Sequence, residues 1–198
     1  MFDMDTAKPV IVTEPAAAKA LSRWFDFLQE RNNQHQGVAV NGRAWRAELR
    51  RSEQPFGALT TAAFHSLNQS LAEHLQFQPS DKLALAIVAH VVSHAHADNK
   101  KSSFPRQLGE QIKGNACLSR LRFDRLLAVK TPAELCSQLT RAVKLRGDNG
   151  INIVSLADGV FLWMREWQQR EQNLPAQSNP FKRFNVRWAS EYLLATEK

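Results

Sequence analysis

Residues 131–146 read TPAELCSQLTRAVKLR, and this stretch decides the fold class. Thr131 precedes a proline and stands three positions before Glu134, which is the pattern of a capping box at the start of a helix. The apolar residues that follow share one helical face, namely Leu135, Leu139, Ala142 and Val143. Arg141 and Lys144 project from the opposite face. The stretch therefore predicts an amphipathic helix that buries one side and displays cations on the other.

Helical spacing of apolar residues extends along almost the whole chain, and no segment combines strand-like alternation with a hairpin turn. We therefore predict an all-α protein of about nine helices in two small lobes or bundles. Three regions are expected, a flexible N-terminus over 1–15, an N-terminal helical lobe over 16–114 and a C-terminal helical bundle over 115–198. The polar run 31–37 is predicted to be a loop. Trp163 and Trp167 share a helical face with other apolar residues, which favours a core position over a base-stacking platform.

Composition places the chain among globular proteins. It has 198 residues, of which 43% are hydrophobic, so it is long and apolar enough to bury a core. Its cysteines, Cys117 and Cys136, lack CxxC spacing and are too few for a disulfide framework, which favours reduced thiols in a cytoplasmic protein. The N-terminal segment has no basic stretch followed by an apolar run, so no secretion signal is expected. No stretch approaches the length of a membrane span, and we expect no contact with a membrane.

The positive charge is concentrated in one window. The net charge is +7, and residues 100–146 hold eleven Lys and Arg against three acidic residues, whereas the rest of the chain is close to neutral. A basic excess confined to part of a surface is typical of proteins that bind a phosphate backbone. A solvated helical surface is the alternative that the charge alone leaves open.

Basic residues are the best functional candidates, because Lys and Arg stay solvated in the free protein and release counterions from phosphates on binding. The predicted nucleic-acid-binding residues are Arg43, Arg46, Arg50, Arg51, Lys100, Lys101, Arg106, Arg141, Lys144, Arg146, Lys182, Arg183 and Arg187. Arg122 and Arg125 lie in an apolar run, where pairing with Asp124 or with a buried carbonyl is favoured instead. The basic segments lack interleaved exposed aromatic residues, which predicts sequence-tolerant backbone contacts rather than base stacking.

The sequence offers little toward catalysis. It contains none of the usual nucleophile, zinc-hydrolase or phosphate-loop motifs, and its acidic residues are too scattered to hold two magnesium ions. We therefore predict no catalytic residue, no metal site and no cofactor. A metal-dependent hydrolase is one alternative, because His90 and His94 stand four apart in a helix predicted from about Ser80 to Asp98. Apolar residues share that helical face, so a structural role for both histidines is favoured.

An ordered series of short motifs resembles a known family. The motifs are QLG at 107–109, LSRLRFDRLL at 118–127, TPAEL at 131–135, LTRAVK at 139–144, INIVSL at 151–156 and VRWASEY at 186–192. In this order they are similar to the small subunit (CasB family) of the type I-E CRISPR Cascade complex. The resemblance extends from Leu21 to Leu194. The N-terminal segment and the polar stretch 32–41 look longer than is usual in that family.

The resemblance implies a non-catalytic subunit of two helical bundles that stabilises an R-loop. Its implied partners are the other Cascade subunits, the crRNA, the target DNA strand, the displaced non-target strand and a second copy of the chain. The cations that best match this role are Arg50, Arg51, Lys100, Lys101, Arg141, Lys144, Lys182 and Arg183. A pure assembly scaffold is the alternative, in which apolar helix faces bind partner subunits and the charge only aids solubility.

Overall fold

The computed structural model describes residue 11 and residues 14–35, 37–112 and 114–196. The α-helices of this described part are α1 (Pro15–Phe27), α2 (Gly42–Arg51), α3 (Ala62–Ala72), α4 (Pro79–Val92), α5 (Phe104–Gly109), α6 (Arg120–Leu127), α7 (Pro132–Arg146), α8 (Ile153–Glu171) and α9 (Phe184–Thr196). Short 3-10 turns are η1 (Gly57–Thr60), η2 (Gly147–Asn149) and η3 (Pro180–Lys182). The strands are β1 (Asn33–His35), β2 (Val38–Val40), β3 (Gln111–Ile112) and β4 (Asn115–Ala116).

The prediction of an all-α protein of about nine helices is confirmed, with two small exceptions. β1 pairs with β2, and β3 pairs with β4, each as an antiparallel hairpin. The prediction of a loop over 31–37 is therefore wrong for Asn33–His35. That run is too polar to show a half-buried alternation, so it carried no strand signal. The expected flexible N-terminus lies almost entirely outside the described residues.

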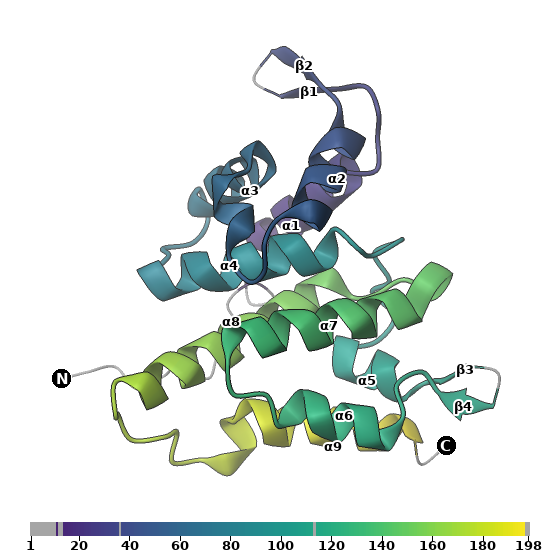
Figure 1. The fold of residues 1–198 in the computed structure, drawn as a ribbon, viewed down its shortest axis with the longest axis vertical. Coiled ribbons are helices and arrows are strands. Elements are labelled where there is room, and N and C mark those ends of the chain that lie inside the picture. Colours follow the sequence, from purple (N-terminus) through teal and green to yellow (C-terminus); the bar gives the residue numbers. More distant parts are fainter. Residues whose placement is uncertain (1–10, 12–13, 36, 113, 197–198) are drawn as a thin grey trace.

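Helix α4 forms the centre of the fold. All of its residues from Ala84 to Val92 are buried, and it packs against α3 on one side and against α7 and α8 on the other. Figure 1 shows α4 crossing the middle of the molecule, with α2 and α3 above it and α7, α6 and α9 below it. One core cluster contains residues from both sides of the predicted lobe boundary. The division into lobes at 114 stays a prediction.

The start of α4 is fixed to α8 by a buried carboxylate. Asp81 accepts a hydrogen bond from the backbone N–H of Gln78 at 3.1 Å, and its carboxylate forms an ion pair with Arg165 Nε on α8, also at 3.1 Å. A buried carboxylate needs such partners because its desolvation is costly. The helix ends at Val92, six residues earlier than predicted, and this moves His94 and Asp98 out of it.

Helix α7 has the structure that its sequence predicts. Thr131 Oγ1 accepts a hydrogen bond from the backbone N–H of Glu134, and the Glu134 carboxylate accepts one from the N–H of Thr131, both at 3.2 Å. The predicted apolar face is buried, whereas Arg141 and Lys144 are exposed. The tryptophans are also core residues, since Trp163 is buried and Trp167 packs half-buried against the core.

Candidate nucleic-acid interface

Helix α2 carries three arginines on one face. Its first turn is capped by Asn41, whose side chain accepts a hydrogen bond from the N–H of Ala44 at 3.2 Å. Arg43, Arg46 and Arg50 follow at spacings of three and four, so they lie along one side of the helix. Like charges this close repel one another, and this repulsion adds to burial in lowering the pKa of Arg46 to about 10.

Two of these arginines bind the C-terminal end of α4. Arg46 Nε and Arg50 Nε each donate to the carbonyl oxygen of Ser93 at 2.8 Å. Arg46 also donates to the carbonyl of Ala95 and to the side chain of Gln29. The last carbonyls of a helix lack intrahelical partners and carry partial negative charge, so cations are favourable there. These hydrogen bonds fix α2 against the C-terminal end of α4 and hold both guanidiniums in place.

Helix α7 adds a lysine to the same place. Burial is the main cause that lowers the pKa of His94, to about 4, and the next causes are the charges of Lys144, His90, Arg50 and Arg46. A coulombic effect of this kind requires these groups to lie near one another. Figure 1 places α2 and α7 on the two sides of α4, and His94, just past the end of α4, lies within electrostatic range of cations from both helices. We call Arg43, Arg46, Arg50 and Lys144 the α2–α7 basic patch.

The histidines have structural surroundings. His90 is buried, and its ring nitrogens lie 3.1 Å from Ser52 Oγ and 3.0 Å from Gln54 Nε2. His94 meets His90 edge to face, with ring centroids 5.3 Å apart. Among the residues that the structure describes, no three His, Cys, Asp or Glu side chains converge on one point where a metal ion would bind. The two rings remain close although α4 ends before His94, and the described residues supply no third ligand beside them.

Asp98 joins three separate segments. Its carboxylate accepts hydrogen bonds from Ser22 Oγ of α1 at 3.0 Å and from the N–H of Ile153, at the start of α8, at 3.4 Å. It also lies 3.4 Å from Lys100 Nζ. Lys100 is exposed in spite of this ion pair, and its neighbour Lys101 is exposed as well. The connector between α4 and α5 is therefore anchored at Asp98 and presents lysines to solvent.

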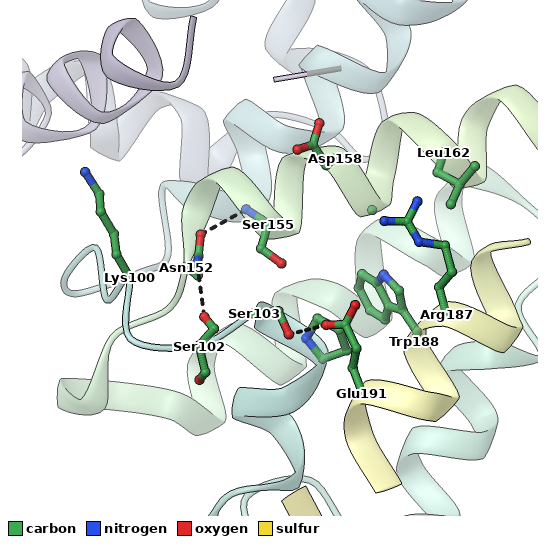
Figure 2. Close-up of a pocket in the computed structure, with 12 residues that line it drawn as sticks. Lys100, Ser102, Ser103, Asn152, Ser155, Asp158, Leu162, Arg187, Trp188 and Glu191 are labelled. Carbon is green, nitrogen blue, oxygen red and sulfur yellow. Dashed lines mark hydrogen bonds between the residues drawn. The ribbon is translucent and has the colours of Figure 1, made fainter. Parts of the chain in front are cut away.

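A polar pocket lies beside this connector, between α8 and α9. It has a volume of about 310 Å³, and Figure 2 shows Lys100 and Arg187 at its opposite ends with Glu191 between them. Ser103 Oγ donates to the Glu191 carboxylate, and Ser155 Oγ accepts from the backbone N–H of Phe104 at 2.9 Å. The fold thus places at one pocket two predicted binding residues, Lys100 and Arg187, that are 87 positions apart in the chain.

Arg146 is a structural residue, which corrects its predicted place on the binding surface. Only 2% of its side chain is exposed. Its Nε donates to the carbonyl of Gly150 at 3.0 Å, and its Nη1 donates to the carbonyl of Gln107 at 2.8 Å and to the Glu110 carboxylate at 3.1 Å. The guanidinium joins the end of α7 to α5 and to the turn before α8. A phosphate cannot reach it without unfolding this contact.

The remaining candidates differ in exposure. Lys182, Arg141 and Arg51 are exposed, whereas Arg106, Arg183 and Arg187 are half-buried. Arg183 Nε donates to the carbonyl of Gln177 at 2.8 Å, which fixes it against its own loop. Lys182, Arg183 and Arg187 belong to the turn before α9 and to α9 itself, which lies on the far side of α7 and α8 from α2 (Figure 1), so these three do not join the α2–α7 basic patch.

Two expectations about aromatic and arginine residues are wrong. Asp124 pairs with Arg120, at 2.8 Å, and the expected partners Arg122 and Arg125 are exposed on α6. Phe181 is 78% exposed next to Lys182, although the basic segments were predicted to lack exposed aromatic residues. The signal for this position was present in the sequence, since Phe181 stands between a proline and two cations in a segment that predicts a turn.

Comparison with known families decides the assignment. The family model of the CRISPR-associated protein Cse2 matches residues 45–193, which is most of the chain. The chain belongs to the Cse2 family. This is the family of the CRISPR Cascade small subunit, so the resemblance identified in the sequence is confirmed. Searches of curated proteins and of solved structures returned no match.

Membership of the Cse2 family places the chain with the other Cascade subunits. The matched region begins inside α2, so it contains every basic candidate except Arg43 and excludes the β1–β2 hairpin. None of the helices in the described residues is long and apolar enough to cross a membrane.

Proposed function

We propose that this chain is the nucleic-acid-binding small subunit of a type I-E Cascade complex and that it stabilises the R-loop through sequence-independent contacts to phosphates. The α2–α7 basic patch is the observation that carries the proposal. Cations from two helices far apart in the sequence meet at one end of α4, and among the described residues no carboxylate forms an ion pair with Arg50 or Lys144.

Fixed cations suit this role for an energetic reason. Guanidiniums held by the Ser93 carbonyl lose little freedom when a phosphate arrives, so binding keeps most of its electrostatic gain. Each phosphate that is neutralised also releases condensed counterions. Formation of an R-loop exchanges one duplex for another of similar stability, so modest protein contacts to the separated strands shift the balance.

The proposed subunit contributes binding and no bond-breaking step. Guide pairing supplies the choice of sequence, and the cations hold the target strand and the displaced non-target strand after they separate. A second copy of the chain in the same complex would extend the basic surface along these strands. Degradation of the target is assigned to a separate enzyme.

The decisive experiment reverses charge in the patch of the assembled complex. Arg50→Glu combined with Lys144→Glu should accelerate dissociation of target DNA by at least about tenfold at physiological salt, because two phosphate contacts become repulsive. Copurification of the other subunits and the guide RNA should be unchanged. Lys82→Glu is the matched control, since Lys82 is exposed in the first turn of α4, about 15 Å along the helix from the patch. An unchanged R-loop lifetime in the double variant contradicts the proposal.

A pure assembly scaffold is the second candidate, and exposed apolar residues favour it. Leu121 on α6 is 63% exposed and Leu194 on α9 is 53% exposed. Large apolar side chains on a surface often mark contacts with other proteins. If the subunit is only a scaffold, Leu121→Ser with Leu194→Ser should remove it from the complex, while the charge-reversed variant keeps full interference activity.

A further inference from the structure

The turn that precedes α9 displays an aromatic ring to solvent. Phe181 is 78% exposed, more than any other large hydrophobic residue of the described chain. Phenylalanine is usually among the most buried residues, and exposure of nearly the whole ring is unfavourable in water. Its neighbour Phe184 is buried, so the segment does not simply lack a core to pack against.

Local hydrogen bonds hold Phe181 in this outward position. The side chain of Asn179 accepts from the backbone N–H of Phe181 at 3.0 Å, and the carbonyl of Asn179 accepts from the N–H of Lys182 at 3.1 Å. Arg183 Nε donates to the backbone carbonyl of Gln177 at 2.8 Å, and the N–H of Asn179 donates to the Gln177 side-chain oxygen at 3.2 Å. A ring displayed by a fixed backbone loses little entropy when a partner stacks on it.

The segment that carries the ring is positively charged. Residues 177–187 contain three cations, Lys182, Arg183 and Arg187, and no acidic residue. Burial raises the pKa of Glu166, and the charges of Arg183 and Arg187 are among the effects that oppose this rise. Both arginines therefore lie near the Glu166 carboxylate. Proteins bind single-stranded nucleic acid by combining an exposed aromatic side chain for the bases with nearby cations for the backbone.

We infer that Phe181 stacks on an unpaired base of a single DNA strand while the neighbouring cations contact its phosphates. The inference rests on the proposed function and deepens it, because only an unpaired base exposes a face to a side chain. In an R-loop the displaced non-target strand is the strand with unpaired bases. Figure 1 places the connection between α8 and α9 at the other end of the long axis from α2, so this site is separate from the α2–α7 basic patch.

The test compares two probes that differ only in their bases. The full chain is titrated with a fluorescent oligothymidylate of about 12 nucleotides and with an abasic oligodeoxyribose phosphate of the same length. Phe181→Ala should weaken binding of the oligothymidylate by roughly 5- to 150-fold at fixed salt and leave binding of the abasic strand unchanged. Phe181→Trp should retain or increase affinity for the oligothymidylate.

Two further variants separate stacking from a general apolar contact. Phe181→Leu keeps the apolar volume without an aromatic face, so it should behave like Phe181→Ala. Leu121→Ala is the matched control, because Leu121 is an exposed apolar residue between Arg120 and Arg122, and it should change neither affinity. Because Phe181 packs little against the core, its variants should keep the melting temperature of the wild type.

The other possible results reject either base stacking by Phe181 or the proposed function as a whole. Wild-type affinity in Phe181→Leu, or an equal loss for both probes in Phe181→Ala, rejects base stacking. Unchanged affinity for both probes combined with loss of Phe181→Ala from the assembled complex assigns the ring to a protein contact instead. Failure of the wild-type chain to bind either probe contradicts the proposed function itself, whereas binding that is insensitive to Phe181 contradicts only this inference.

Discussion

Lys144 and Arg146 lie two residues apart on α7, yet they belong to regions with opposite roles. Residues two apart on a helix point about 200° away from each other. Lys144 therefore faces solvent in the α2–α7 basic patch, whereas Arg146 turns into the protein and is 2% exposed. The comparison teaches that a cation in a basic segment acquires its role from its direction on the helix, and that sequence charge alone does not separate the two roles.

The two regions also differ in what satisfies the charge. Arg146 is enclosed by the carbonyls of Gln107 and Gly150 and by the Glu110 carboxylate, so its hydrogen-bonding groups find partners inside the fold. Arg50 uses its Nε for the Ser93 carbonyl and is otherwise exposed. A buried charge must be compensated by groups within the protein, whereas an exposed cation stays hydrated and is available to bind an external anion.

The largest expected effect comes from breaking the buried region. Arg146→Ala should lower the free energy of unfolding by about 3 kcal/mol, because it leaves buried carbonyl oxygens without donors. Urea-induced unfolding measures this loss. Lys144→Ala is the control on the same helix, and it should change stability by no more than about 0.5 kcal/mol. Equal effects of the two variants would remove the distinction between the regions.

The next effect is on the salt dependence of binding. Arg50→Gln combined with Lys144→Gln should reduce the slope of log affinity against log salt by about 1.4 for a single strand, since two phosphate contacts are lost. Fluorescence anisotropy with an oligothymidylate across a salt series gives the slope. The charge-matched control is Lys82→Gln with Lys130→Gln, two exposed lysines outside the patch. Equal slopes of log affinity against log salt for the wild type and the patch variant would show that the patch does not contact phosphates.

Most of the fold was predictable because it follows local patterns. The capping box at Thr131 and the apolar spacing behind it define α7, and the structure has both. The end of α4 was not predictable to the same degree, because apolar and small residues continue past Val92 without a glycine or proline. The β1–β2 hairpin was missed because it is short and lacks an alternating apolar face.

The candidate site was predictable in composition and not in geometry. The sequence identified the arginines of α2 and the lysine of α7, but no periodicity indicates that they meet at Ser93 and His94. This meeting depends on the packing of α2 and α7 against α4, which is a tertiary property. The burial of Arg146 depends in the same way on α5 and on the segment after α7, which supply its partners.

The smallest expected effect is a pH dependence that reports on the patch. The pKa of His94 is about 4 in the folded protein, against 6.5 for an unperturbed histidine. Between these values the unfolded chain binds more protons than the folded one, so acidification favours unfolding. The contribution of His94 to the free energy of unfolding is therefore fully present above about pH 6.5, and it is lost as the pH falls toward 4. Since the ring is partly exposed, solvent screening keeps the effect below about 1 kcal/mol.

Thermal melting of the wild type and of His94→Gln at pH 7.5 and pH 5 measures this contribution. The wild type should lose more stability between these values than the variant does, and His65→Gln, an exposed histidine on α3, should behave like the wild type. The charges that hold the pKa of His94 down include those of Lys144, Arg50 and Arg46. Phosphates bound to these cations should therefore raise it, which a histidine NMR titration with and without an oligothymidylate detects. A pKa for His94 that does not move on saturation would place the strand away from the patch, whatever the affinity.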